Sequence, residues 1–113
     1  DTDQLRWARG YDHTYILDKE LGKLAIASRC SSPKTGIVME VYTDQPGVQL
    51  YTGNWMSGNL RGKHDHRYPA RAALCLETQH YPDSPNKPEY PSTRLNPGET
   101  FRSTTIFRFT LEA

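Results

Sequence analysis

Cysteine, membrane-length apolar runs and leader-like segments are all scarce or missing in this 113-residue sequence. The two cysteines, Cys30 and Cys75, are too few for a disulfide framework and lack the paired spacing of a zinc site. We expect buried free thiols and a cytoplasmic location, with a single disulfide left open. No stretch approaches the ~20 apolar residues of a membrane span, and DTDQLRWARG at the start does not resemble a signal peptide. We therefore expect a soluble protein without a membrane partner.

An excess of charge of one sign is missing as well. Fourteen Lys and Arg against thirteen Asp and Glu give a net charge of +1, and neither sign forms a long block. Proteins that bind nucleic-acid backbones normally carry a basic patch or stripe. We therefore expect no nucleic-acid partner.

Apolar residues are also less frequent than in a typical globular domain. They make up 35% of the sequence, against a usual ~45–50%. The chain is long enough for one domain, residues 1–113, with a single core. That core must be thin or completed by other residues.

Helical periodicity is almost absent, and what the sequence has instead is short β-branched and aromatic runs between glycines and prolines, eight of each. This pattern predicts an all-β, antiparallel fold. The expected strands are Lys23–Cys30, Gly36–Thr43, Val48–Thr52, Arg71–His80 and Thr100–Leu111.

The last expected strand has the most regular alternation. Its core-facing side should consist of Phe101, Ser103, Thr105, Phe107, Phe109 and Leu111. Two longer stretches, Ser57–Tyr68 and Tyr81–Gly98, are predicted to be loops. The second contains most of the prolines, which excludes a helix there.

Glu77 stands in a run that otherwise resembles a buried strand. Alternation places Leu74 and Leu76 on one side, and Ala73, Cys75 and Glu77 on the other. If that second side faced open solvent, Glu77 would be an ordinary exposed residue. Because alanine and cysteine prefer burial, we expect instead an enclosed or cleft-lining face, where a glutamate needs a partner or a purpose.

A second polar group lies beside an aromatic ring in GVQLYTGN, where Gln49 and Tyr51 share a strand face. Amides, carboxylates and flat rings together suit a sugar site, because hydroxyls need paired donors and acceptors. Taken alone this is a weak signal, since most β-sandwiches with such residues have no such function. In GYDHTYIL, Asp12 and His13 form an ionisable pair, although Asp12 could also close an Asx turn or pair with Arg9.

Metal binding is the main rival chemistry. His64-Asp65-His66 and Glu77-x-x-His80 both resemble ligand spacings. The second pair would face opposite sides of a strand, and the first lies in a predicted loop without a third ligand. The sequence also lacks a Gly-x-Ser-x-Gly elbow and a phosphate-binding glycine loop.

Four segments in this order resemble the C-terminal portion of the aldose 1-epimerases, or galactose mutarotases: GYDHTYIL, QPGVQLYTGNWM, ALCLETQHYPDSPN and LNPGETFRSTTIFRF. The resemblance runs from about Gly10 to Phe109 and is loose only over Ser57–Arg71. It implies a large antiparallel β-sandwich, the mutarotase-like supersandwich, of which this chain is the C-terminal part. It further implies a concave face that binds galactose or glucose and interconverts its α and β anomers, without a metal or organic cofactor.

The resemblance also assigns roles to three residues. The family's general base falls on Glu77, and its sugar-binding aspartate and glutamine fall on Asp12 and Gln49. Many relatives have asparagine after the Tyr-Asp-His segment, where this chain has Thr14, so no substrate contact is assigned to that position.

Two further histidines of the family's site, one of them the general acid, lie upstream of Gly10. None of the histidines present matches either position: His13, His64, His66 and His80. We therefore expect the chain to need an upstream part of the same fold. A non-catalytic carbohydrate-binding β-sandwich and an inactive truncated fragment are the alternatives.

Overall fold

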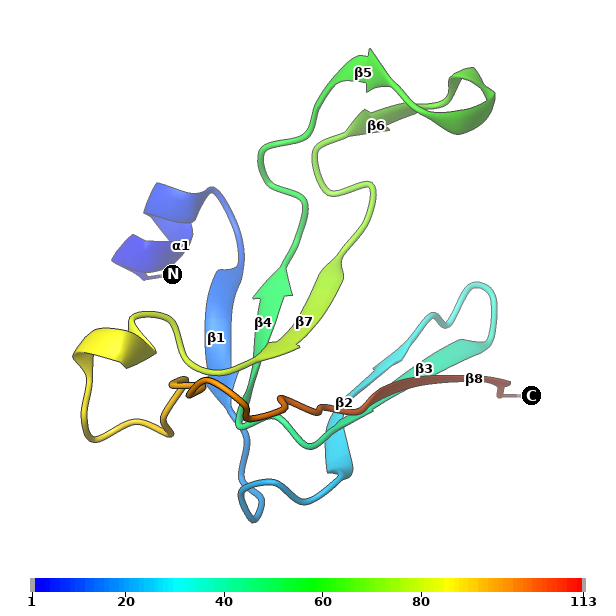
Figure 1. Ribbon diagram of the computed structural model, residues 1–113. Helices are drawn as coiled ribbons and strands as arrows, with labels where there is room; N and C mark the ends of the chain where they lie inside the picture. The colour runs from blue at the N-terminus through cyan, green and yellow to red at the C-terminus, as the bar shows by residue number, and fades with distance from the viewer. Residues whose placement is uncertain (1, 113) are drawn as a thin grey trace. The chain divides into compact units, whose positions relative to one another are not determined.

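A computed structural model describes residues 2–112, and their regular secondary structure is mostly β-strand (Figure 1). The chain divides into two compact units, Asp1–Tyr15 with Gln49–Glu77 and Ile16–Val48 with Thr78–Ala113, called here the first and second unit. The elements in chain order are α1 Asp3–Ala8, β1 Asp12–Ile16, β2 Ala25–Ser31, β3 Ile37–Thr43, β4 Gly47–Tyr51, β5 Ser57–Arg61, η1 Lys63–Asp65, β6 Arg67–Pro69, β7 Cys75–Gln79, η2 Ser84–Asn86 and β8 Thr105–Leu111.

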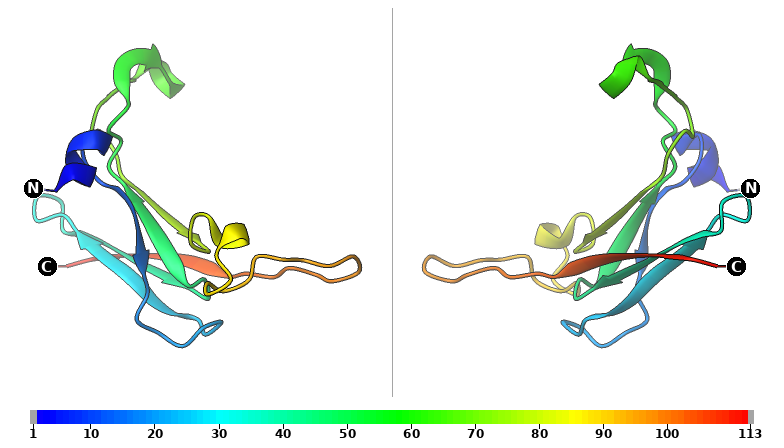
Figure 2. Two further views of the ribbon diagram at one scale, coloured as in Figure 1. Left: turned by 90° about the vertical axis from the view of Figure 1, so that its left-hand side faces the viewer. Right: turned by 90° about the vertical axis from the view of Figure 1, so that its right-hand side faces the viewer.

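The strands form three small sheets, and the prediction of an all-β fold with little helix is confirmed. The second unit contains the antiparallel sheet β2-β3-β8 (Figure 2). Most residues of β1, β4 and β7 belong to the first unit, where these strands form the sheet β1-β4-β7. In the same unit β5 and β6 pair as an antiparallel hairpin between β4 and β7. All five predicted strands are present, with bounds that differ at their ends.

The largest such difference is at the start of β8, which was predicted at Thr100 and is found at Thr105. Just before β8 the chain bonds to Asp44, the residue after β3, and Thr104 O accepts from Asp44 N over 3.2 Å. Thr104 N donates to Asp44 Oδ2 over 2.8 Å, and Ser103 Oγ donates to Asp44 Oδ1 over 2.7 Å. These contacts give Ser103 Oγ and Thr104 N hydrogen-bond acceptors, although β8 begins only at Thr105.

Several short elements were not predicted from the sequence. The helix α1 begins after Thr2, whose hydroxyl accepts a hydrogen bond from the N–H of Leu5, and it ends at Arg9 in the left-handed conformation. The predicted loop Ser57–Tyr68 contains β5 and part of β6, and the predicted loop after β7 contains one 3₁₀ turn at Ser84–Asn86. No helix within residues 2–112 is long and apolar enough to cross a membrane.

The core is thin, as the low apolar content predicts. Its buried apolar side chains are Val38, Val41 and Val48. The prediction that β8 contributes a core face is wrong for the described residues, because Phe107 is 48% and Phe109 64% exposed. β8 is an edge strand that pairs with β3 in the register Val41↔Phe107 and Met39↔Phe109.

The prediction of buried thiols is also wrong. Cys30 and Cys75 are both free, but Cys75 is exposed and Cys30 only half-buried.

Asp44 anchors the segment before β8, which makes the stability of the second unit sensitive to acid. Burial raises the pKa of the Asp44 carboxyl, but hydrogen bonds led by those from Ser103 and Thr104 outweigh it, so the pKa lies below its ordinary value of 3.8. A carboxyl whose pKa is lowered by folding stabilises the fold above its unfolded pKa, and this contribution is lost as the pH falls through the folded pKa.

We therefore expect Asp44→Asn to lower the free energy of unfolding by about 1–3 kcal/mol at neutral pH, because the hydrogen bonds lose a charged acceptor. The difference from the unsubstituted protein should shrink as the pH falls below 3.8. Urea unfolding at pH 7 and pH 3 measures it. If the two proteins differed equally in free energy of unfolding at both pH values, the charge of Asp44 would not contribute to stability.

Candidate functional site

Three neighbouring strands of the first unit each carry one of the residues expected to form the site. Asp12 is the first residue of β1, Gln49 lies in the middle of β4, and Glu77 lies in the middle of β7. Because the strand order is β1-β4-β7, Gln49 occupies the central strand and the two carboxylates lie on the strands either side of it (Figure 1).

Asp12 and Gln49 are in direct contact. Gln49 Nε2 donates a hydrogen bond to Asp12 Oδ1 over 2.8 Å. At the other end of the same amide, Gln49 Oε1 accepts a hydrogen bond from Thr14 Oγ1. The ionised carboxylate can only accept hydrogen bonds, so it fixes which end of the amide faces Asp12. The pair thereby offers an acceptor and a donor side by side.

Glu77 differs from its expected surroundings. Cys75 and Glu77 in β7, and Ala73 just before it, are all exposed, so the predicted enclosed face is wrong for residues 2–112. The inference failed because the burial preferences of alanine and cysteine are averages over many proteins, whereas burial at one site depends on what covers it. The Glu77 carboxylate is accessible from solvent on the strand next to that of Gln49.

A compact set of hydrogen bonds aligns β1 with β4 beside the Asp12–Gln49 pair. Thr52 N donates to Tyr11 O and Tyr11 N donates to Thr52 Oγ1, each over 3.1 Å. The buried Asn54 donates from Nδ2 to the same Tyr11 carbonyl over 2.8 Å. A Cβ at Gly10 would lie 2.2 Å from Asn54 Oδ1, so only glycine allows this approach. Neither Asn54 nor Gly10 was expected to have a role, although both lie in segments that resemble the family.

The pairing of Asp12 with Arg9 that the sequence left open is not found among residues 2–112. The Arg9 guanidinium lies 4.8 Å from the centroid of the Trp55 ring instead of pairing with Asp12. Asp12 begins β1, and its side chain accepts from Gln49 Nε2. His13 accepts a hydrogen bond at Nδ1 from the Asp12 backbone N–H over 3.0 Å, and its ring packs edge-on against Tyr11.

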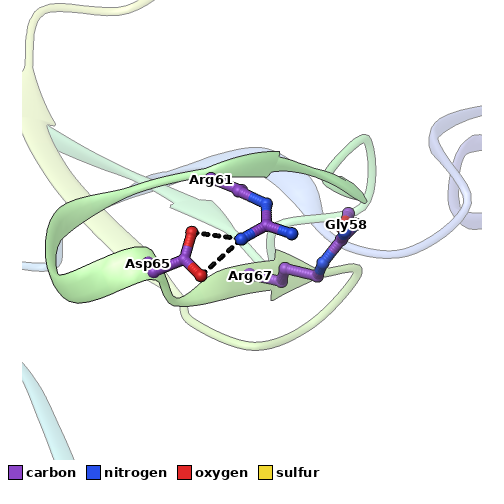
Figure 3. Close-up of polar contacts among 4 residues, drawn as sticks. All are labelled: Gly58, Arg61, Asp65 and Arg67. Atoms are coloured by element: carbon purple, nitrogen blue, oxygen red, sulfur yellow. Dashed lines mark hydrogen bonds and ion pairs between the residues drawn. The ribbon is translucent and has the colours of Figure 1, made fainter.

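The histidine-rich segment forms the tip of the β5–β6 hairpin. The carboxylate of Asp65 accepts from the guanidinium of Arg61 (Figure 3). The rings of His64 and His66 meet edge to face, with centroids 6.5 Å apart. Across residues 2–112, no group of three or more His, Cys, Asp or Glu side chains is arranged to hold a metal ion.

His80, the other member of the second ligand-like spacing, is engaged in the second unit. Its Nδ1 lies 2.8 Å from Oε1 of the buried Gln45, whose Nε2 donates to Ser103 Oγ over 2.7 Å. Ser103 in turn donates to the carboxylate of Asp44. Asp44 can only accept, so Ser103 donates to it and accepts from Gln45 Nε2. The remaining end of that amide, Gln45 Oε1, can only accept, so neutral His80 carries its hydrogen on Nδ1.

Comparison with known proteins gives a consistent result. A family model described as aldose 1-epimerase matches residues 1–108. Galactose mutarotase from Mus musculus is 46% identical over 102 residues, covering 90% of this chain and 30% of that protein. Galactose mutarotase from Homo sapiens is 44% identical over the same extent. Aldose 1-epimerase from Escherichia coli (strain K12) is 36% identical over 115 residues, covering 99% of this chain and 32% of that protein. The chain thus spans about a third of the length of these relatives.

Proposed function

The chain belongs to the aldose 1-epimerase family, and we propose that its protein interconverts the α and β anomers of a hexose such as galactose or glucose. Several relatives carry the name galactose mutarotase, which supports a sugar substrate. The observation that carries the proposal is the Asp12–Gln49 hydrogen bond of 2.8 Å on β1 and β4, with Glu77 on the adjoining β7.

In the proposed reaction Glu77 is the general base. Its carboxylate takes the proton from the C1 hydroxyl while a general acid gives a proton to the ring oxygen, and the bond between C1 and that oxygen breaks. The open aldehyde then turns about the C1–C2 bond. The hydroxyl that was the ring oxygen adds to the other face of the carbonyl carbon, with the acid and base exchanging roles.

Asp12 and Gln49 orient the sugar in this proposal. Asp12 accepts a hydrogen bond from one ring hydroxyl, and Gln49 donates its second Nε2 hydrogen to a neighbouring one. Two such contacts hold C1 within reach of Glu77, and orientation of this kind contributes as much to rate as proton transfer does. No cofactor has a role in this scheme.

We assign the general acid to a histidine in an upstream part of the same β-sandwich, so the active protein is longer than this chain. Two features of the described residues support this assignment. The carboxylate of Glu77 is exposed, and so are the apolar side chains of β8. Both would be covered by further strands of a complete sandwich.

A cytoplasmic location is part of the proposal. Both cysteines are free, as expected for a protein kept in a reducing compartment.

The test is the return of freshly dissolved α-D-galactose to its anomeric equilibrium, followed by polarimetry with the full-length protein that contains this chain. The protein should shorten the relaxation well below that in buffer, and chelator should leave the rate unchanged. Relaxation at the buffer rate would refute the proposed function. Full activity from a native protein of 12.9 kDa would refute the upstream general acid.

A further inference from the structure

Thr14 lies two residues after Asp12 on β1, and its hydroxyl contacts the side chain of Gln49. Residues two apart on a strand point to the same side. Asp12 and Thr14 therefore hold the two ends of one amide, with Gln49 Nε2 donating to Asp12 and Gln49 Oε1 accepting from Thr14. We propose that Thr14 is a positioning residue that holds the plane of the Gln49 amide in place for binding a hexose, while Asp12 selects which end of the amide faces it.

The orientation of this amide matters because its two ends have nearly the same shape but opposite hydrogen-bonding chemistry. With Nε2 toward Asp12, its second hydrogen is directed to a ligand oxygen. If the amide were reversed, Oε1 would face the carboxylate of Asp12, and two acceptors would oppose each other. Asp12 thus selects the orientation of Gln49.

Asp12 alone is a weak restraint. Its side chain is exposed, so water competes for the carboxylate, and in the proposed reaction a sugar hydroxyl also bonds to it. Thr14 and Gln49 are half-buried, which protects the contact between them. Thr14 therefore holds the plane of the amide while Asp12 exchanges between solvent and ligand.

This inference rests on the proposed function, because it gives Gln49 a hexose hydroxyl to bind. It goes further by separating two tasks within the site. Thr14 acts through Gln49 on sugar binding, whereas proton transfer belongs to Glu77 on β7. Loss of the Thr14 hydroxyl should therefore change binding and leave the chemical step nearly intact.

Thr14→Val tests this, because valine keeps the β-branched shape and replaces only the hydroxyl, with a methyl group. In the full-length protein we expect KM for galactose to rise about three- to tenfold, the usual effect of one hydrogen bond, with kcat within about twofold. Thr14→Ser should restore KM, because the hydroxyl returns. In a Gln49→Ala background Thr14→Val should have no further effect, since its target is gone.

A second readout does not depend on activity. By NMR, the chemical shift of the Gln49 Nε2 hydrogen that bonds to Asp12 should move in Thr14→Val and return in Thr14→Ser. An unchanged shift together with an unchanged KM would overturn the positioning role. If the unsubstituted protein fails to interconvert anomers, the proposed function is lost, and the NMR comparison alone decides the role of Thr14. If the valine variant does not fold, Thr14→Ala replaces it with the same expected results.

Discussion

Replacing Glu77 by glutamine should reduce the rate of anomer interconversion by the full-length protein about 10²–10⁴-fold, the usual contribution of one positioned acid or base. Glutamine has nearly the same shape and can still form hydrogen bonds, but it cannot take the C1 proton. Polarimetry measures the rate. Equilibrium binding of galactose, followed by isothermal titration calorimetry, should change little, because the contacts at Asp12 and Gln49 remain.

Glu89→Gln is the matched control, since Glu89 is an exposed glutamate in the loop before β8. It should retain full activity. If Glu77→Gln were as active as this control, Glu77 would not be the base. If the unsubstituted protein bound galactose without accelerating interconversion, the non-catalytic carbohydrate-binding alternative would replace the proposed function.

Local sequence pattern was sufficient to predict β2, β3, β4, β7 and β8, but not β1. β3 forms within one residue of its predicted bounds, whereas β7 begins at Cys75 and not at the predicted Arg71. The β5–β6 hairpin was not predicted because SGNLRG contains no β-branched residue. Its strands are held by pairing with each other, which no pattern within either one reveals.

Burial was predicted less well than strand position, and the reason is physical. Alternation shows which side chains share a face, but whether that face is covered depends on residues distant in sequence. Phe107, Phe109 and Glu77 were all expected under cover and are all exposed within residues 2–112.

The residues of the candidate site were likewise predicted only in part from the sequence. Residue type and family resemblance indicated Asp12 and Gln49, and their direct hydrogen bond is consistent with that pairing. Thr14 was passed over because it differs from the asparagine common in relatives. Its contact with Gln49 joins two strands and is visible only once β1 lies beside β4.

Asp12→Asn should have the second largest effect on the proposed activity, a loss of about 10–150-fold in kcat/KM for galactose. A hydrogen bond to a charged acceptor typically contributes about 1.5–3 kcal/mol, and that range corresponds to this loss. Asparagine can still accept from Gln49 through its amide oxygen, so the pair persists while the charged acceptor for the sugar hydroxyl disappears. Most of the loss should therefore be a rise in KM. Steady-state kinetics measures it against Asp18→Asn, which replaces an exposed aspartate just after β1. Equal KM values in the two variants would show that Asp12 does not bind the sugar.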